Sequence, residues 1–263
     1  MDLGLNGKRA LVCGSSQGLG RAIAETLAAE GADIVINSRS PEKLAVVRDE
    51  IASATGAKVV GVPADISNPA GRDDLLDGAR QALGAIDILV TNVGGPPPGP
   101  FEAHDTTAWS LAFAQLLESV VSLVGALLPD MKERRWGRIV NVTSITVKQP
   151  VEGLILSNSL RAAVTGFAKT ISNEAAPFGV TVNNVLPGFT RTERLVGLAA
   201  ATAERTGGTV EGAYDAWRKD VPMGRLGEPE ELAALTAFLC SEKAAYITGQ
   251  SIAVDGGWIK GLF

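Results

Sequence analysis

Two serines and an arginine within eighteen residues carry side chains that can donate hydrogen bonds to a ligand. Ser144 follows a β-rich run, and Ser157 comes thirteen residues later, near the start of an apolar helical stretch that also carries Arg161. A serine hydroxyl can donate a hydrogen bond but is a poor general acid on its own. Arg161 stays protonated, and its fork of donors can clamp ribose hydroxyls or a carboxylate. The alternative for Ser144 is a routine turn residue.

A glycine-rich segment near the N-terminus indicates a nucleotide site. Residues 13–20 read Cys-Gly-Ser-Ser-Gln-Gly-Leu-Gly, and they lie between the first expected strand and the first expected helix. Glycine lets the backbone turn tightly and approach a pyrophosphate, and the helix N-terminus offers free N–H groups to it. The alternative is a tight turn that binds no ligand.

Alternating β-rich and helical runs must position these residues. We expect strands at 8–13, 33–37, 58–63, 87–91, 137–143, 180–186 and 251–254. We expect helices at 18–30, 41–55, 69–83, 106–131, 157–176 and 229–241. This alternation predicts an α/β fold, a parallel sheet covered by helices on both faces. The remaining long segment, about 190–227, reads as irregular and is expected to act as an active-site lid.

Composition favours one large domain spanning residues 1–263. Hydrophobic residues make up 46% of the chain, and the net charge of −5 gives no indication of nucleic acid or an anionic membrane as a partner. No uninterrupted apolar run reaches the roughly 20 residues of a membrane span, and the N-terminus does not resemble a signal peptide. Cys13 and Cys240 are too few for a metal cluster and read as buried apolar residues. We therefore expect a cytoplasmic protein without a bound metal.

Five motifs resemble the short-chain dehydrogenase/reductase family, and they come in that family's order over almost the whole chain. They are the Gly-x-x-x-Gly-x-Gly loop starting at Gly14, Asp65 after the third strand, Asn92-Val93-Gly94 after the fourth, the segment 187–192 (Pro-Gly-Phe-Thr-Arg-Thr), and the C-terminal segments 246–250 and 254–257. Within the family the chain is most similar to the β-ketoacyl-carrier-protein reductases. The resemblance implies a single-domain, Rossmann-type, doubly wound parallel sheet.

The resemblance also implies where a nicotinamide cofactor would bind. The positions that match the family's cofactor contacts are Gly14, Ser16, Gln17, Gly18, Leu19, Gly20, Ser38, Arg39, Asp65, Ile66, Asn92, Val93, Gly94, Arg161, Pro187, Gly188, Thr190 and Thr192. At the end of the second strand an acid would select NAD, whereas an arginine accommodates a 2′-phosphate. Ser38 and Arg39 therefore favour NADP(H), unless Arg39 is simply a solvated surface residue.

The catalytic positions depart from the family's pattern. Ser144 stands at the position of the serine that binds the substrate carbonyl. Ser157 stands in place of the family's tyrosine, Arg161 in place of its lysine, and Leu116 in place of its helix asparagine. Hydride chemistry in this family uses the tyrosine as its acid, so the usual proton donor is absent from this chain.

The resemblance places the substrate beside two loops. Lys148 and Glu152 lie between Ser144 and Ser157, where the family's substrate cleft is lined, and Gly95 and Pro96 belong to a proline-rich loop expected to form a stiff wall. A desolvated Lys148 could serve as acid or carboxylate anchor; the alternative is a solvated loop lysine. The loop could instead be a proline-rich recognition ligand.

Two further side chains are candidate proton donors. His104 is the only histidine, and it follows the loop after the fourth strand. Tyr214 lies in the expected lid and could fold over the site. For His104 the alternative is a solvated loop residue, and for Tyr214 it is a packing role.

The sequence thus predicts an NADP(H)-preferring oxidoreductase that acts on a small-molecule carbonyl or alcohol. Two alternatives remain open: a catalytically silent NADP(H)-binding protein, and a non-redox enzyme that uses a Ser/Arg site on the same fold. Family resemblance implies a homo-oligomer, a tetramer or a dimer, in which the helices expected at 106–131 and 157–176 pair; the alternative is burial of their apolar faces within the monomer. Leu262 and Phe263 suggest an interface weakly.

Overall fold

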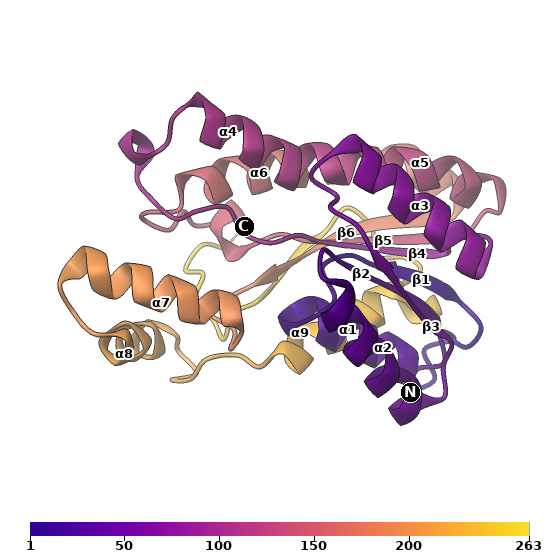
Figure 1. Cartoon of the computed structure of the whole chain (residues 1–263), viewed down its shortest axis with the longest axis horizontal. Coiled ribbons are helices and arrows are strands. Elements are labelled where there is room, and N and C mark those ends of the chain that lie inside the picture. The colour runs from indigo at the N-terminus through magenta and orange to yellow at the C-terminus, as the bar shows by residue number, and fades with distance from the viewer. Residues whose placement is uncertain (263) are drawn as a thin grey trace.

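Seven parallel strands form one central sheet in the computed structural model, which describes residues 1–262 (Figure 1). Phe263 lies outside the described residues. The strand order is β3-β2-β1-β4-β5-β6-β7. The chain adds strands on one side of β1 and then, from β4 on, on its other side, and this switch point leaves a crevice at the carboxyl ends of the strands. The strands are β1 (Arg9–Val12), β2 (Asp33–Ser38), β3 (Val59–Pro63), β4 (Ile88–Asn92), β5 (Gly137–Val142), β6 (Val180–Pro187) and β7 (Ser251–Val254). The predicted doubly wound sheet is confirmed.

Helices cover both faces of the sheet, as Figure 1 shows. One face carries α1 (Gly18–Ala29), α2 (Pro41–Thr55) and α9 (Pro229–Cys240), which pack with the sheet in one apolar cluster. The other carries α3 (Pro69–Leu83), α4 (Thr106–Phe113), α5 (Ser119–Glu133) and α6 (Ile155–Ala175), which pack in a second cluster. Burial on both faces explains why the central strands are continuous apolar runs.

Local signals in the sequence fix several helix ends. The Ser40 hydroxyl caps α2 by accepting the backbone N–H of Lys43, and Pro41 takes the first helical position. Gly56 ends the same helix in the left-handed conformation, with φ 72°, as expected for a helix C-terminus. Asn68 caps α3 in the same way. Both helices have the predicted boundaries.

The long helical stretch predicted at 106–131 contains a π-helical turn. Residues Ala114–Glu118 form this turn between α4 and α5, and such turns often occur at functional sites. By length and composition, the combined stretch Thr106–Glu133 could cross a membrane. A core helix passes the same test, and here Leu116, Leu123 and Leu127 are buried in the apolar cluster on this face.

The segment 190–227 is helical, which the sequence prediction missed. It contains α7 (Glu193–Thr206) and α8 (Val210–Asp220), which pack on each other. Thr192 and Thr209 cap these two helices through their hydroxyl groups. The many Ala, Gly and Thr residues dilute the apolar periodicity that would have revealed the helices. In Figure 1 the pair lies beyond the carboxyl ends of the strands, where a lid would be placed.

Candidate active site

The glycine loop joins the start of α1 to the ends of β1 and β4. Gly14 has φ 57°, and its carbonyl accepts a hydrogen bond from the Asn92 side-chain amide at 3.0 Å. A Cβ at Gly20 would lie 2.2 Å from the Gly14 carbonyl oxygen. Two of the motif's glycines are therefore required by the packing of the loop itself.

The start of α1 is left open for a ligand. Gln17 precedes the helix without capping it through its side chain, and the first turn carries no acidic residue. The first N–H groups of α1 are thus available to a phosphate, favoured by the helix dipole. Ser15, which sequence reasoning did not single out, supports the loop: its hydroxyl donates to the Val12 carbonyl at 2.7 Å and accepts the Asn37 N–H at 2.9 Å.

Basic side chains gather where β2 ends. Arg39 is exposed, and Lys43 of α2 donates a hydrogen bond to the side chain of Gln17 at 3.1 Å. Burial raises the pKa of Asp65, but hydrogen bonds from Ser67 and the positive charge of Arg39 outweigh this and hold it below its ordinary value. Asp65 therefore stays ionised beside Arg39. Lys43 was not predicted to belong to this site.

The loop after β4 is tied to the π-helical turn. Gln115 of that turn donates its amide to the Gly94 carbonyl at 2.9 Å. The neighbouring Leu116 is 1% exposed and packs in the core. The polar contact from this helix to the loop is thus made by Gln115 rather than by position 116.

The Ser144 hydroxyl is half-buried and oriented by the backbone. Its Oγ accepts the Thr146 N–H at 3.1 Å and caps the short 3₁₀ turn Ile145–Val147. Because this bond uses a lone pair, the hydroxyl proton remains available to a substrate oxygen. Both sequence-based interpretations of Ser144 therefore fit the same geometry.

Ser157 and Arg161 are buried one turn apart on α6. Each is 8% exposed. Ser157 Oγ makes no hydrogen bond within residues 1–262, and α6 begins two residues earlier than predicted, at Ile155. Arg161 donates to the Val142 carbonyl at 2.9 Å and to the Val93 carbonyl at 3.3 Å. Its guanidinium therefore lies at the carboxyl ends of β4 and β5. Desolvation and the charge of Arg194 lower the pKa of Arg161 to about 10, so it remains cationic at neutral pH.

Arg194 of α7 approaches the same loop from the lid, and sequence reasoning missed it. Its Nη2 donates to the Pro96 carbonyl at 2.7 Å. A Cβ at Gly95 would lie 2.7 Å from its guanidinium, so the absence of a side chain at position 95 makes this contact possible. The residue as a whole is exposed, while desolvation of the guanidinium against the loop lowers its pKa.

Segment 187–192 continues from the end of β6 into the lid. Gly188 donates its N–H to the Val254 carbonyl at 3.0 Å, and a Cβ at this position would lie 2.7 Å from the Asp255 Cα. Thr190 is buried, and Thr192 caps α7. Methyl and carboxylate atoms of Thr192 and Glu193 lie about 3.5 Å or less from a Cβ built on Gly18. The lid thus packs against the glycine loop.

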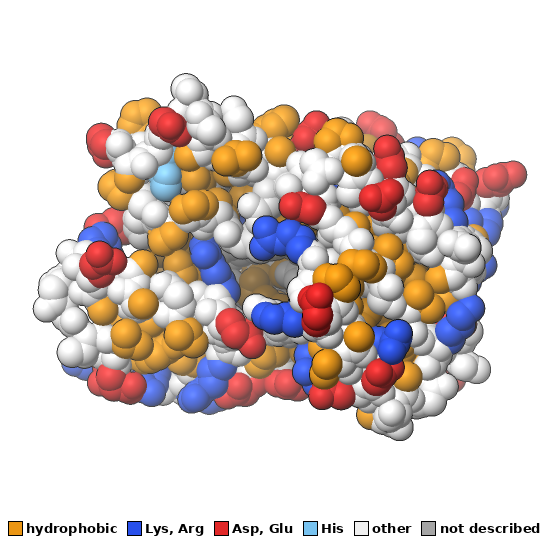
Figure 2. All heavy atoms as spheres, in the orientation of Figure 1, with side chains coloured by type: hydrophobic (Ala, Val, Ile, Leu, Met, Phe, Trp, Pro, Cys, Tyr) orange, Lys and Arg blue, Asp and Glu red, His pale blue; other side chains and the backbone are white. Residues whose placement is uncertain are grey.

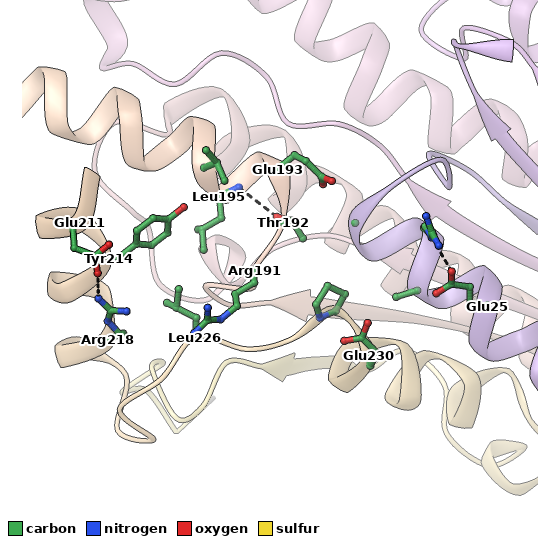
Figure 3. Close-up of a pocket in the computed structure, with 15 residues that line it drawn as sticks. Glu25, Arg191, Thr192, Glu193, Leu195, Glu211, Tyr214, Arg218, Leu226 and Glu230 are labelled. Carbon is green, nitrogen blue, oxygen red and sulfur yellow. Dashed lines mark hydrogen bonds and ion pairs between the residues drawn. The ribbon is translucent and has the colours of Figure 1, made fainter. Parts of the chain in front are cut away.

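A cleft of about 740 Å³ opens beside the glycine loop, between α1, α7, α8 and the start of α9 (Figure 3). Gly18 and Arg21 line it on one side, and Thr192, Leu195 and Tyr214 on the other. It does not include Ser144, Ser157 or Arg161. Figure 2, in the orientation of Figure 1, shows a hollow near the centre of the molecule with Lys and Arg side chains at its rim.

Comparison with known proteins identifies the chain's relatives. A family model described as enoyl-(acyl carrier protein) reductase matches residues 14–259. The chain is 34% identical over 257 residues to the 3-oxoacyl-[acyl-carrier-protein] reductase FabG of Aquifex aeolicus, covering 98% of this chain and 99% of that protein. It is 32% identical over 256 residues to the NADPH-dependent reductase BacG of Bacillus subtilis, covering 97% and 99%. The chain belongs to the short-chain dehydrogenase/reductase family.

Solved structures of short-chain dehydrogenases/reductases match the fold end to end. L-sorbose reductase from Gluconobacter frateurii, complexed with NADPH and L-sorbose, superimposes with a TM-score of 0.94 at 33% identity and full coverage of both chains. YwfH, an NADPH-dependent reductase involved in bacilysin biosynthesis, gives 0.93 at 32% identity, covering 98% of this chain and all of that one. The predicted family, fold and oxidoreductase class are confirmed.

The residues present fit the nicotinamide cofactor of this family. The first turn of α1 has uncapped N–H groups, and the exposed Arg39 follows Ser38 at the end of β2. Ile66 is buried beside Asp65, Leu19 packs on the core of the α1 face, and Ser16 is half-buried in the loop. These residues could therefore hold the phosphate groups and the adenosine ribose of the cofactor.

Two of the predicted substrate residues lie exposed on the loop before α6. Lys148 is exposed. Glu152 is exposed and forms an ion pair with Arg205 of α7 at 2.9 Å, which joins the loop before α6 to the lid. The proline-rich loop pairs with that loop too, because Gly99 donates its N–H to the Gly153 carbonyl at 2.7 Å. That the proline-rich loop walls the substrate site stays a prediction.

Candidate acids and nucleophiles elsewhere have packing roles. Within residues 1–262, His104 Nε2 is buried without a hydrogen-bond partner, close to Gly99. The alternative of a solvated loop histidine therefore does not describe this nitrogen. Tyr214 packs edge-on against Trp217, with ring centroids 5.7 Å apart. Cys13 and Cys240 are buried, as predicted, and burial raises the pKa of both thiols to about 12, so they stay protonated at neutral pH.

Proposed function

We propose that this chain is an NADP(H)-preferring oxidoreductase that interconverts a carbonyl group and an alcohol. The observation that carries the proposal is the pair formed by an open phosphate site at α1 and an oriented hydroxyl at Ser144. When bound, the cofactor supplies the hydride or accepts it. Relatives described as an NADPH-dependent reductase and as a complex with NADPH support the cofactor class.

Each site residue has a separate task in this proposal. Ser144 donates its free proton in a hydrogen bond to the substrate oxygen, since its own Oγ is held by the Thr146 N–H. Ser157 carries the second hydroxyl, which makes no hydrogen bond within residues 1–262 and is free for substrate or for a water that relays a proton. Arg161 holds the ends of β4 and β5 in register through two carbonyls. Lys148, exposed at the loop, is the alternative proton source.

The cofactor preference rests on the basic end of β2. Arg39 and Lys43 would pair with a 2′-phosphate, and Ser38 stands in place of the acid that would bind a ribose 2′-hydroxyl. Arg39→Asp should weaken NADPH binding by roughly 10- to 100-fold, since a charge-assisted hydrogen bond contributes about 1.5–3 kcal/mol. NADH binding should change far less. Fluorescence titration with NADPH and with NADH measures both affinities, and Arg48→Asp, at another exposed arginine on α2, is the control. Equal losses of affinity for both cofactors would refute the preference.

One experiment separates the proposed function from a silent NADP(H)-binding protein. That second function is favoured by the loss of the acid at Ser157 and by the use of Arg161 donors on backbone carbonyls. Cofactor binding is measured first by thermal shift, and NADPH oxidation is then followed over a panel of ketones, aldehydes and oxo acids. Turnover that falls at least tenfold in Ser144→Ala supports the oxidoreductase. Tight binding with no turnover in any member of the panel would leave the silent binder.

A further inference from the structure

Two arginines bracket the short loop that follows β4. Arg161 donates to the carbonyl of Val93 at the start of the loop, and Arg194 donates to that of Pro96 three residues later. Arg161 comes from α6 beneath the sheet edge, and Arg194 from the lid helix α7. Two guanidinium groups from elements far apart in the sequence thus contact the same loop.

Both guanidiniums keep donors for a ligand. A guanidinium has five N–H donors; Arg161 uses two of them on carbonyls, and Arg194 uses one. Arg161 is 8% exposed, so its remaining N–H groups have little access to bulk water. A buried cationic donor set of this kind is stabilised by an anion with complementary geometry.

Neither arginine has a carboxylate partner within residues 1–262. Two other arginines of segment 190–227 have such partners: Arg191 pairs with Glu228 at 3.0 Å, and Arg205 pairs with Glu152 at 2.9 Å. Arg161 and Arg194 instead repel one another, and this repulsion adds to the desolvation that lowers the pKa of Arg161. Two like charges held close to one loop cost free energy unless an anion lies between them.

The position of Arg161 and Arg194 indicates which anion they would bind. The cofactor pyrophosphate belongs at the first turn of α1, beside β1. Arg161 lies instead at the ends of β4 and β5, where it holds the carbonyl of Val142, two residues before Ser144. An anion at this place would be next to the hydroxyl that orients the substrate carbonyl.

We propose that Arg161 and Arg194 bind a carboxylate of the substrate, so that the substrate is an oxo acid or the corresponding hydroxy acid. This inference rests on the proposed function and names its substrate class. In the reducing direction a hydride passes from NADPH to the carbonyl carbon and one proton reaches the oxygen, which gives the hydroxy acid and NADP⁺. The carboxylate keeps its charge throughout.

Matched acids and esters test the proposal by turnover. Pyruvate, acetoacetate and levulinate place the carboxylate at increasing distances from the ketone, and each has a neutral methyl ester. We expect kcat/KM for at least one acid to exceed that of its ester by more than tenfold in the wild type. Arg194→Met should remove this preference mainly through KM, and Arg194→Lys should restore part of it. Lys219→Met, which removes one charge from the exposed face of α8, is the matched control.

A binding measurement keeps the test independent of turnover. Butanoate has the chain length of acetoacetate but no ketone, and butanamide is its neutral counterpart. Calorimetry on the protein–NADPH complex should detect butanoate and not butanamide, with a loss of at least tenfold in Arg194→Met. Gly95→Ala should weaken it similarly, because the added Cβ displaces the Arg194 guanidinium without altering Arg161.

The outcomes separate the two proposals. If esters are reduced as well as acids and butanoate does not bind, the carboxylate site is refuted while the oxidoreductase stands. If butanoate binds through Arg194 but no carbonyl compound is reduced, the carboxylate site stands and the oxidoreductase fails. If Arg194→Met weakens NADPH binding tenfold and leaves butanoate binding unchanged, the guanidinium serves a cofactor phosphate and the proposal is refuted.

Discussion

The hydroxyl at Ser157 differs from the family's phenol in acidity as well as in size. A phenol has a pKa near 10 that neighbouring positive charge can bring toward neutrality, whereas an alkyl hydroxyl does not ionise in the accessible range. Arg161 beside it is protonated below a pKa of about 10. Its positive charge is therefore present throughout the neutral range and is lost as the pH rises through that value. Neither Ser144, Ser157 nor Arg161 changes protonation between roughly pH 6 and 9.

The pH profile of reduction should reflect this substitution. We expect kcat for a neutral ester to be flat from about pH 6 to 9 in the wild type. The double variant Ser157→Tyr/Arg161→Lys restores the family's acid and its cationic neighbour, so its kcat should fall as rising pH deprotonates the phenol. Stopped-flow NADPH oxidation across this range measures both profiles. A wild-type profile that bends within this range would contradict the expectation.

At the scale of elements, helix boundaries and loops that are set by nearby residues could be predicted from the sequence. Caps and a glycine stop gave α2 its boundaries at Pro41 and Thr55, and the strand–glycine–helix order located the cofactor loop. The two lid helices were missed because small residues weaken their apolar periodicity. The π-helical turn at Ala114–Glu118 leaves no mark in the hydrophobic pattern. The capping residues Thr192 and Thr209 could have indicated that the lid segment contains two helices.

Contacts between distant segments were beyond the sequence pattern. Arg194 meets the Pro96 carbonyl across 98 residues, and no local motif distinguishes it from a solvated arginine at the start of a helix. The ion pair of Glu152 with Arg205 likewise joins two segments that no sequence motif links. Positions carried over from a family predict the backbone well, since the fold fixes it, and predict long side chains poorly.

The glycine loop allows a prediction about an element as a whole. An added Cβ at Gly20 would lie 2.2 Å from the Gly14 carbonyl oxygen and 2.6 Å from the Asn92 amide nitrogen. Gly20→Ala should therefore push α1 away from the end of β4 and cost about 1–3 kcal/mol of stability, a fall in Tm of roughly 2–10 °C. NADPH affinity should fall with it. Gly197→Ala in α7, where nothing lies within 4 Å of the new Cβ, is the control; equal melting temperatures in both variants would contradict this account.

At the scale of the molecule, an apolar surface remains uncovered on the α4–α5 side. Leu111 is 67% exposed, Phe113 47% and Val121 40%. All three belong to the continuous helical stretch Thr106–Glu133, whose other apolar residues include several buried in the core. A monomer seldom exposes several large apolar side chains along one helix without a partner. We propose that a second copy of the chain covers this surface, which agrees with the homo-oligomer that the family resemblance implies.

Charges placed on this surface should dissociate the assembly. Leu111→Glu/Val121→Glu would bury two carboxylates in the contact, which costs several kcal/mol per interface unless the charges are paired. We expect light scattering coupled to gel filtration to give two or four times the 27.2 kDa chain mass for the wild type and a smaller multiple for the variant. Val46→Glu is the matched control, because Val46 is 57% exposed on α2, at the opposite face of the sheet. A wild-type mass of one chain, or equal effects of both changes, would show that the α4–α5 surface is not the contact.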